Sequence, residues 1–188
     1  REGLPRGGDR GMTILQSLDR YYERMAARGE AEPPGFTREN VSYAISLGRD
    51  GSVREVIDLR VQAGKKLVPA RMSVPRPKRT SNVQANFLWD KTAYVFGVDG
   101  GKSKRLDREH ASFKEMHEEM LSGDHSEHAQ ALLAFLAAWK PEAFLAPPFH
   151  RDMLDASFVF RLDGERQFLH QVPHLRKLWL SSLADVES

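Results

Sequence analysis

The most constraining feature of this 188-residue chain is a stretch of alternating apolar and polar residues that begins at Val41. Apolar side chains occupy every second position through Leu47, and an Asp50-Gly51 pair follows. An extended apolar pattern then resumes and continues to Val61. Alternation of this kind is typical of a strand with one buried face, and Asp-Gly favours a tight turn between two strands. The sequence therefore predicts a β-hairpin over residues 41–61.

Periodic segments elsewhere predict the remaining elements. The expected elements are a helix from Met12 that ends before Gly29, a strand over residues 92–98, a helix opened by Asp107, a helix capped by Ser126 and stopped by Pro141, a second hairpin over residues 158–169, and a closing helix from Pro173. A proline-punctuated basic segment over residues 65–84 is interpreted as a loop. This order is not the alternation of a βαβ fold. It predicts the α+β class, with a largely antiparallel sheet of hairpins packed by about four helices in a single domain.

Composition excludes several classes of protein. The chain has no cysteine, which rules out disulfide frameworks, thiolate metal sites and cysteine nucleophiles. No apolar run approaches the roughly 20 residues that a membrane-spanning helix needs, and the first residues lack the order of a signal peptide. We therefore expect a soluble, cytoplasmic protein. Residues 1–11, which carry no periodic pattern, are interpreted as a disordered leader or tag remnant, and residues 12–188 as the folded domain.

The charged residues are distributed unevenly, although the formal net charge is only +2. Between Arg60 and Trp89 there are seven basic residues and no acidic one, whereas acidic residues concentrate between Asp107 and Glu127. Such a basic segment attracts a polyanion, and neighbouring amide and hydroxyl side chains can bond phosphates or base edges. The alternative is a solvated basic loop that only keeps the surface soluble. The candidate nucleic-acid contacts are Lys65, Lys66, Arg76, Lys78, Arg79, Thr80, Ser81, Asn82, Gln84 and Asn86.

A glycine-rich segment at residues 97–103 invites comparison with a phosphate-binding loop. That motif needs four residues between its first glycine and the Gly-Lys-Ser triplet, because that many backbone N–H groups surround the phosphates. Here there are three. We interpret the segment as a glycine-rich turn that adds a secondary basic patch, formed by Lys102, Lys104 and Arg105.

Catalytic chemistry finds little support in the residues. His117, His125 and His128 cluster with acids, which leaves open a metal-dependent nuclease, but their spacing matches no ligand motif, and histidines on an acidic amphipathic helix are usually solvated. No Gly-x-Ser-x-Gly nucleophile elbow occurs. The three tryptophans, Trp89, Trp139 and Trp179, occupy positions typical of core. We therefore expect a protein that is not an enzyme and that uses neither a metal nor a cofactor.

Several segments together resemble a known family. They are the helix that starts at Met12, the Pro-Pro-Gly-Phe run at residues 33–36, the block Pro-Lys-Arg-Thr-Ser-Asn-Val-Gln-Ala-Asn-Phe-Leu-Trp-Asp at residues 77–90, the Tyr-Val-Phe-Gly run at residues 94–97, and the stretches at residues 131–139 and 158–164. These segments resemble the large subunit of the type I-C CRISPR surveillance complex, Cascade. The resemblance runs from Met12 to the end of the chain. Because members of that family are several times longer, residues 12–188 would be the N-terminal domain of such a subunit.

The resemblance implies a function. In that family the large subunit is not a nuclease; it recognises the short protospacer-adjacent motif in duplex DNA, helps to open the duplex and recruits a separate helicase-nuclease. Five residues match the family block, namely Lys78, Arg79, Thr80, Ser81 and Asn86. Its Phe87, Leu88 and Trp89 are expected to be core that anchors the loop. Implied partners are double-stranded target DNA, subunits that carry the CRISPR RNA, the helicase-nuclease and acidic phage inhibitors that mimic DNA. The alternative is a scaffold domain that docks a partner subunit or the RNA handle, with DNA contacts made elsewhere.

Overall fold

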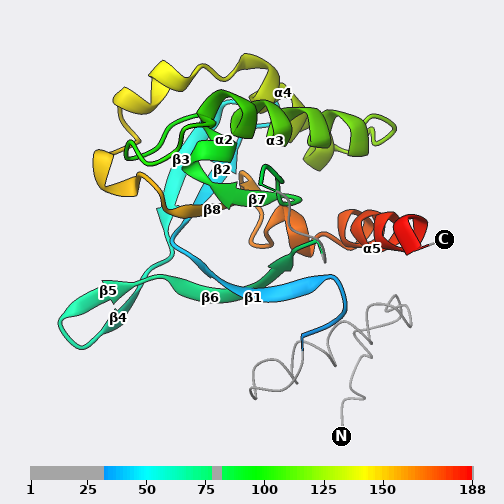
Figure 1. Ribbon diagram of the computed structural model, residues 1–188, viewed down its shortest axis with the longest axis horizontal. Coiled ribbons are helices and arrows are strands. Elements are labelled where there is room, and N and C mark those ends of the chain that lie inside the picture. Colours follow the sequence, from blue (N-terminus) through cyan, green and yellow to red (C-terminus); the bar gives the residue numbers. More distant parts are fainter. Residues whose placement is uncertain (1–31, 78–81, 188) are drawn as a thin grey trace, which may run out of the picture. The chain divides into compact units, whose positions relative to one another are not determined.

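The centre of the fold is a four-stranded sheet in the order β3-β2-β8-β7 (Figure 1). A computed structural model of the protein describes residues 32–77 and 82–187, and residues 35–188 form one unit that is separate from residues 1–34. The strands are β2 (Tyr43–Leu47), β3 (Val53–Asp58), β7 (Trp89–Lys91) and β8 (Ser157–Leu162). β2 is antiparallel to β3 and parallel to β8, and β7 is antiparallel to β8. The expected α+β class is confirmed.

The predicted hairpin forms at β2 and β3, joined by a turn at residues 48–52 in which the Gly48 N–H donates to the Ser52 carbonyl over 2.8 Å. Its second strand ends at Asp58, earlier than predicted. The alternation suggested one exposed face, yet every residue of β2 is buried. β2 lies between two strands, and the sheet is packed on both faces. Tyr43, Ile45 and Leu47 join a large core on one face, and Ala44 joins a smaller core on the other.

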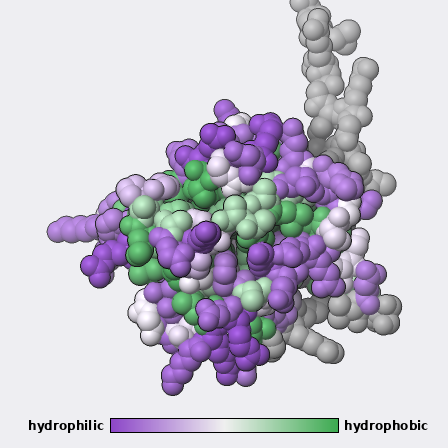
Figure 2. Space-filling model, turned by 90° about the horizontal axis from the view of Figure 1, so that it is seen from above, coloured by the Kyte–Doolittle hydropathy of each residue, from purple (hydrophilic) through white to green (hydrophobic). Residues whose placement is uncertain are grey.

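Helices pack beside this sheet. They are α2 (Thr92–Val95), α3 (Leu106–Met120), α4 (Glu127–Ala138) and α5 (Pro173–Glu187), and three short 3-10 turns accompany them, η1 (Pro141–Leu145), η2 (Arg151–Met153) and η3 (Leu169–Gln171). In Figure 1, α2, α3 and α4 lie together on one side of the sheet. Seen from that side, hydrophilic residues dominate the periphery and hydrophobic ones gather toward the middle (Figure 2). None of the helices in the described part of the chain is long and apolar enough to cross a bilayer.

The helix boundaries confirm part of the sequence analysis. The Ser126 hydroxyl accepts a hydrogen bond from the Ala129 N–H over 3.2 Å and caps α4, as predicted, and α5 begins at Pro173. α3 begins one residue before Asp107, with Arg105 at the N-cap, so Asp107 is not the cap. It lies in the first turn instead, where a carboxylate still interacts favourably with the helix dipole. The expected leader and the expected helix from Met12 lie outside the described residues.

Two predicted strands are wrong. Residues 92–95 form the helix α2, and the preceding residues form β7 instead. A short run in which every residue is buried carries no alternation, so it cannot distinguish a strand from a buried helical turn. The second strand of the second hairpin is reduced to one bridge between Arg161 and Phe168, because β8 already pairs with β2 and β7 on its two edges.

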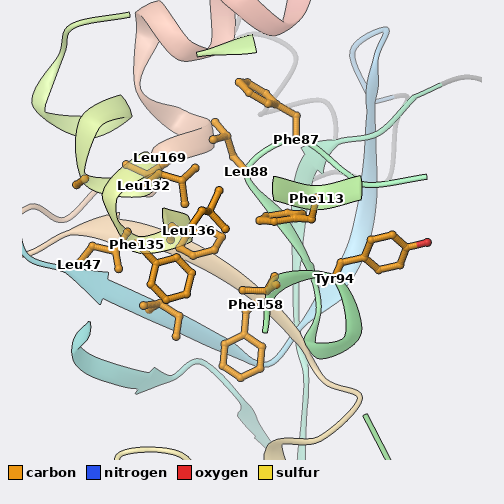
Figure 3. Close-up of a cluster of buried hydrophobic side chains, with 14 of the residues drawn as sticks. Leu47, Phe87, Leu88, Tyr94, Phe113, Leu132, Phe135, Leu136, Phe158 and Leu169 are labelled. Carbon is orange, nitrogen blue, oxygen red and sulfur yellow. The ribbon is translucent and has the colours of Figure 1, made fainter. Parts of the chain in front are cut away.

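Aromatic side chains fill the main core (Figure 3). Phe96 lies at its centre, 5.0 Å from Phe158 between ring centroids and edge-on to it. Full burial of one such side chain is worth roughly 1.5–3 kcal/mol, so this cluster supplies much of the stability of the fold. Trp89 and Trp179 are buried and Trp139 packs against the core, which confirms the interpretation of the tryptophans.

The basic segment is not a loop over most of its length. Residues 61–75 form the hairpin β4 (Val61–Ala63) and β5 (Lys66–Val68) and the strand β6 (Ala70–Pro75). β6 pairs antiparallel with β1 (Phe36–Val41), the strand that precedes β2. Strand formation was not apparent from sequence because the basic and proline residues obscure any alternation. The consequence is that the basic residues are spread along a ribbon.

Two glycines provide a matched test of the turns. Gly51 and Gly64 both have positive φ, but only at Gly51 would a Cβ overlap with the backbone of Phe135 and Ala134 in α4. We expect Gly51→Ala to lower the free energy of unfolding by about 3 kcal/mol or more, and Gly64→Ala by about 1 kcal/mol, the usual cost of the left-handed region. Denaturant unfolding of both variants measures this, and equal losses would show that β2-β3 does not pack on α4 as described.

Candidate nucleic-acid interface

The loop that follows β6 is closed at its base by a side chain. The Trp89 indole N–H donates to the Pro75 carbonyl over 2.5 Å, which joins the end of β6 to the start of β7. Phe87 and Leu88 are fully buried beside it, so the expected anchoring of the loop by residues 87–89 is confirmed. Leu88 has a φ of 68°, a conformation that costs a leucine on the order of 1–2 kcal/mol and that the surrounding packing must hold.

Buried side chains, rather than a neighbouring strand, bind the backbone of residues 84–88. Three alternate N–H groups each donate to one side chain: Gln84 to the Tyr94 hydroxyl at 3.2 Å, Asn86 to the Asp90 carboxylate at 2.8 Å, and Leu88 to Nε2 of His117 at 2.9 Å. An unpaired buried N–H costs roughly 1–3 kcal/mol, so each acceptor determines where its amide lies. The path of this half of the loop is therefore set by β7, α2 and α3.

His117 is the most deeply buried of these acceptors. Its Nδ1 lies 2.7 Å from the Phe113 carbonyl, so Nδ1 carries the proton and Nε2 is free to accept from Leu88. Burial lowers the pKa of His117 to about 4, which keeps the ring neutral. The expectation of a solvated histidine is wrong here. The signal was present in the sequence, because His117 follows Phe113 by four residues and therefore shares its apolar helix face.

Asp90 is also buried. Its two oxygens accept from the N–H groups of Asn86 and Lys91, both at 2.8 Å. Burial nevertheless dominates and raises the pKa of Asp90 to about 7. No sequence pattern distinguishes such a carboxylate from a surface one, since its environment comes from elements far along the chain.

The secondary basic patch joins this loop through Tyr94. Burial, together with the nearby carboxylates of Asp90 and Glu109, raises the pKa of the Tyr94 hydroxyl. Glu109 also accepts a hydrogen bond from the Ser103 hydroxyl, which connects residues 99–105 to the same cluster. Three basic side chains are exposed on this second loop, those of Lys102, Lys104 and Arg105.

The second loop is not a phosphate-binding loop. The N–H groups of Gly101 and Ser103 donate to the Asp99 carboxylate, at 3.1 Å and 2.6 Å, so the protein's own carboxylate fills the place that a phosphate would take. The interpretation as a glycine-rich turn fits this geometry.

The structure separates the remaining candidate residues. Asn82 is exposed on the loop, whereas Gln84 and Asn86 are half-buried. Arg76 forms an ion pair with Glu39 of β1. Lys65 and Lys66 are exposed at the tip of β4-β5, at the opposite end of β6 from the loop. Four further candidates lie outside the described residues: Lys78, Arg79, Thr80 and Ser81.

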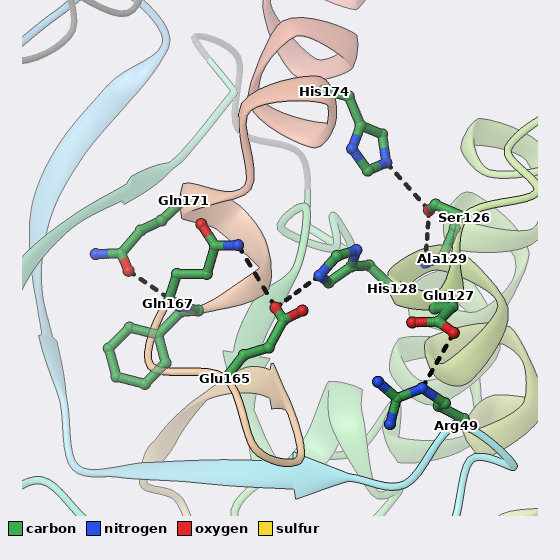
Figure 4. A network of polar contacts seen from close by, with 10 residues as sticks. Arg49, Ser126, Glu127, His128, Ala129, Glu165, Gln167, Gln171 and His174 are labelled. Carbon is green, nitrogen blue, oxygen red and sulfur yellow. Dashed lines mark hydrogen bonds and ion pairs between the residues drawn. The ribbon is translucent and has the colours of Figure 1, made fainter. Parts of the chain in front are cut away.

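A second polar cluster joins α4, the turn after β8 and α5 (Figure 4). Nε2 of His128 lies 2.7 Å from Glu165, and Nε2 of His174 lies 3.1 Å from both Asp124 and Ser126. An aspartate, a histidine and a serine thus meet, but a catalytic relay needs the two imidazole nitrogens to contact different partners. Here Nε2 of His174 makes both contacts, and the Ser126 oxygen caps α4. The cluster therefore has a structural role: it connects the start of α5 to the start of α4.

The alternative of a metal-dependent nuclease gains no geometric support. His117 uses both ring nitrogens in hydrogen bonds, and His128 is paired with Glu165. Within residues 32–77 and 82–187, no three histidine or acidic side chains come close enough together to hold a metal ion.

The described residues thus present two loops that are connected through Tyr94. One carries the exposed side chain of Asn82, and the other carries the exposed basic side chains of Lys102, Lys104 and Arg105. The model of the CRISPR-associated protein (Cas_Csd1) family matches residues 18–188. The chain therefore belongs to this family, which is that of the type I-C Cascade large subunit, as the sequence resemblance implied. Among curated proteins, none matches the chain.

The buried carboxyl of Asp90 makes the stability of the fold depend on pH. Its pKa is about 7 in the folded protein and near 3.8 when unfolded, so the stabilisation that it provides is complete below pH 4 and is lost as the pH rises to about 7. Asp90→Asn does not titrate. We expect the free energy of unfolding of wild type relative to Asp90→Asn to fall by on the order of 4 kcal/mol between pH 4 and pH 8.

Denaturant unfolding across this pH range measures the difference. The buried histidines titrate in both proteins, so their effect cancels in the comparison. Parallel stability curves for the two proteins would contradict a buried Asp90.

Proposed function

We propose that this chain recognises the protospacer-adjacent motif in duplex DNA, as a non-catalytic subunit of a type I-C Cascade. The observation that carries the proposal is the firm attachment of residues 84–88 to Tyr94, Asp90 and His117, directly beside exposed Asn82. In RNA-guided complexes the guide reads the target by base pairing, and the protein reads only a short flanking motif. A reader of that kind needs a few polar side chains held in one place.

The two kinds of side chain in this loop have separate roles in the proposal. Lys78 and Arg79 neutralise phosphates, which supplies affinity that falls with salt. Asn82 carries a donor and an acceptor and reads base edges, while Asn86 contributes less because it is half-buried. Lys102, Lys104 and Arg105 extend the positive surface on the adjoining loop.

The wider role is proposed from the family resemblance. Residues 12–188 would be the N-terminal domain of a longer large subunit that acts in the cytoplasm, helps to open the duplex once the motif is bound, and recruits the helicase-nuclease. The scaffold alternative assigns the same surface to a partner subunit or to the RNA handle, and the experiments below distinguish the two.

Reversing two charges in the loop tests the phosphate contacts. In the assembled complex, we expect Lys78→Glu with Arg79→Glu to weaken binding of target DNA by more than about tenfold, and to make the dependence of affinity on salt shallower by roughly 2 logarithmic units per decade. The matched control is Lys140→Glu with Lys177→Glu, two exposed lysines outside both loops. Equal affinities for wild type and the loop variant would leave the scaffold alternative as the better account.

Truncating one amide tests base reading. We expect Asn82→Ala to reduce the difference in binding free energy between correct and incorrect motifs by on the order of 1–3 kcal/mol. Affinity for incorrect motifs stays nearly unchanged. Asn40→Ala, an exposed asparagine on β1, is the matched control. Binding by the assembled complex to a library with a randomised motif gives both quantities. A motif preference that survives Asn82→Ala and Asn86→Ala would place the reader elsewhere.

A further inference from the structure

The hairpin β4-β5, which we call the arm, projects from the rest of the fold (Figure 1). Its two strands pair only with each other, in a sheet of their own, and are joined by Gly64 and Lys65. Gly64 has a φ of 63°, as a two-residue hairpin turn with glycine at its first position requires, and a Cβ placed on it would meet nothing within 4 Å. Residues 61–67 are all exposed. An isolated hairpin of this kind is at best marginally stable in water, so its projection calls for a partner.

The tip of the arm is strongly positive. Lys65 and Lys66 are adjacent and exposed, and no acidic residue follows before Asp90. The last carboxylate before the arm, that of Asp58, is already engaged by the guanidinium of Arg60 at 3.0 Å and 2.8 Å. No acidic side chain in the sequence of the arm opposes the two lysines, and charge complementarity therefore favours an anionic partner.

The apolar residues of the arm argue against a protein partner. Val61 and Leu67 are each 50% exposed. In the register of the hairpin Val61 lies opposite Val68, and Leu67 lies opposite Gln62 at the next position. Adjacent positions of a ribbon point to opposite faces, so the two side chains do not form one apolar face. A ribbon with polar and basic residues at its tip instead suits a nucleic acid, whose grooves admit two-stranded ribbons.

The strand that follows the arm sets its distance from the loop. β5 leads into β6, and β6 pairs with β1 from Val41-Ala70 at the arm end to Phe36-Pro75 at the loop end. Lys66 and Pro77 are eleven residues apart. At about 3.3 Å per residue, this extended segment spans at most roughly 36 Å. That length is close to one helical turn of B-DNA, roughly 34–36 Å.

We propose that Lys65 and Lys66 bind the sugar-phosphate backbone of the duplex about one helical turn outside the motif. This inference rests on the proposed function of the loop. On the other side of the motif the target strand pairs with the guide, so duplex DNA one turn away exists only on the flank. The arm reads no sequence. It adds affinity and holds the axis of the duplex while the loop reads the motif.

DNA targets of graded flank length test the proposal. The assembled complex binds targets whose duplex extends about 5, 10, 15 or 20 base pairs beyond the motif, at two salt concentrations. We expect the affinity of the wild-type complex to rise once the flank passes about 10 base pairs, by on the order of tenfold. Lys65→Glu with Lys66→Glu abolishes this rise. On long flanks it also makes the slope of log affinity against log salt concentration shallower by roughly 2. Affinity for the shortest flank is unchanged. Lys140→Glu with Lys177→Glu behaves as wild type.

Three outcomes would overturn the proposal. Affinity that does not depend on flank length in wild type shows that no duplex reaches the arm. An equal defect of the arm variant on short and long flanks assigns the lysines to the RNA or to the target strand. Loss of the variant subunit from the complex assigns the arm to a partner protein. A failure of the function proposed for the loop can be distinguished from a failure of the arm proposal. Asn82→Ala is expected to change motif preference at every flank length, whereas the arm variant is expected to preserve that preference.

Discussion

Three hydrogen bonds determine where the candidate site lies. Tyr94, Asp90 and His117 accept alternate N–H groups of residues 84–88, so a segment with no strand partner follows one path. Each acceptor comes from a different element, β7, α2 or α3, and all three are buried against the aromatic core. The position of the surface loop therefore depends on the packing beneath it. A change deep in the core at Phe113 or Phe87 would reach the loop through His117.

The same acceptors make the stability of the fold sensitive to pH in two opposite ways. Burial holds the pKa of His117 at about 4, so the stability of the fold decreases as the pH falls from about 6.5 to about 4, because histidine in the unfolded chain takes up its proton first. Burial holds the pKa of Asp90 at about 7, so the stability of the fold decreases as the pH rises from about 4 to about 7. Both costs come from keeping an ionisable group in the core.

Folding divides a continuous basic segment into two surfaces. Lys65 and Lys66 lie at the tip of the arm and Asn82 lies at the loop, with β6 between them. Other basic residues of the segment are already engaged by the protein. Arg76 pairs with Glu39, and Arg71 donates to the side chain of Asn40 and to the Arg38 carbonyl. Among the basic residues of this segment that the structure describes, Lys65 and Lys66 are both exposed, at the tip of the arm.

The sequence by itself determined the elements whose signals are local. Alternation, capping and burial over a few residues predict four of them. These are the β2-β3 hairpin, the Ser126 cap, the start of α5 at Pro173, and the anchoring of the loop by Phe87, Leu88 and Trp89. The family was also accessible, because it depends on motifs along the chain. Tertiary structure decided the rest. Residues 92–95 are helical, β6 is a strand, and His117 and Asp90 hold the loop because partners distant in sequence bury them. A buried run has no period to read, and an acceptor has no function until folding brings its donor within hydrogen-bonding distance.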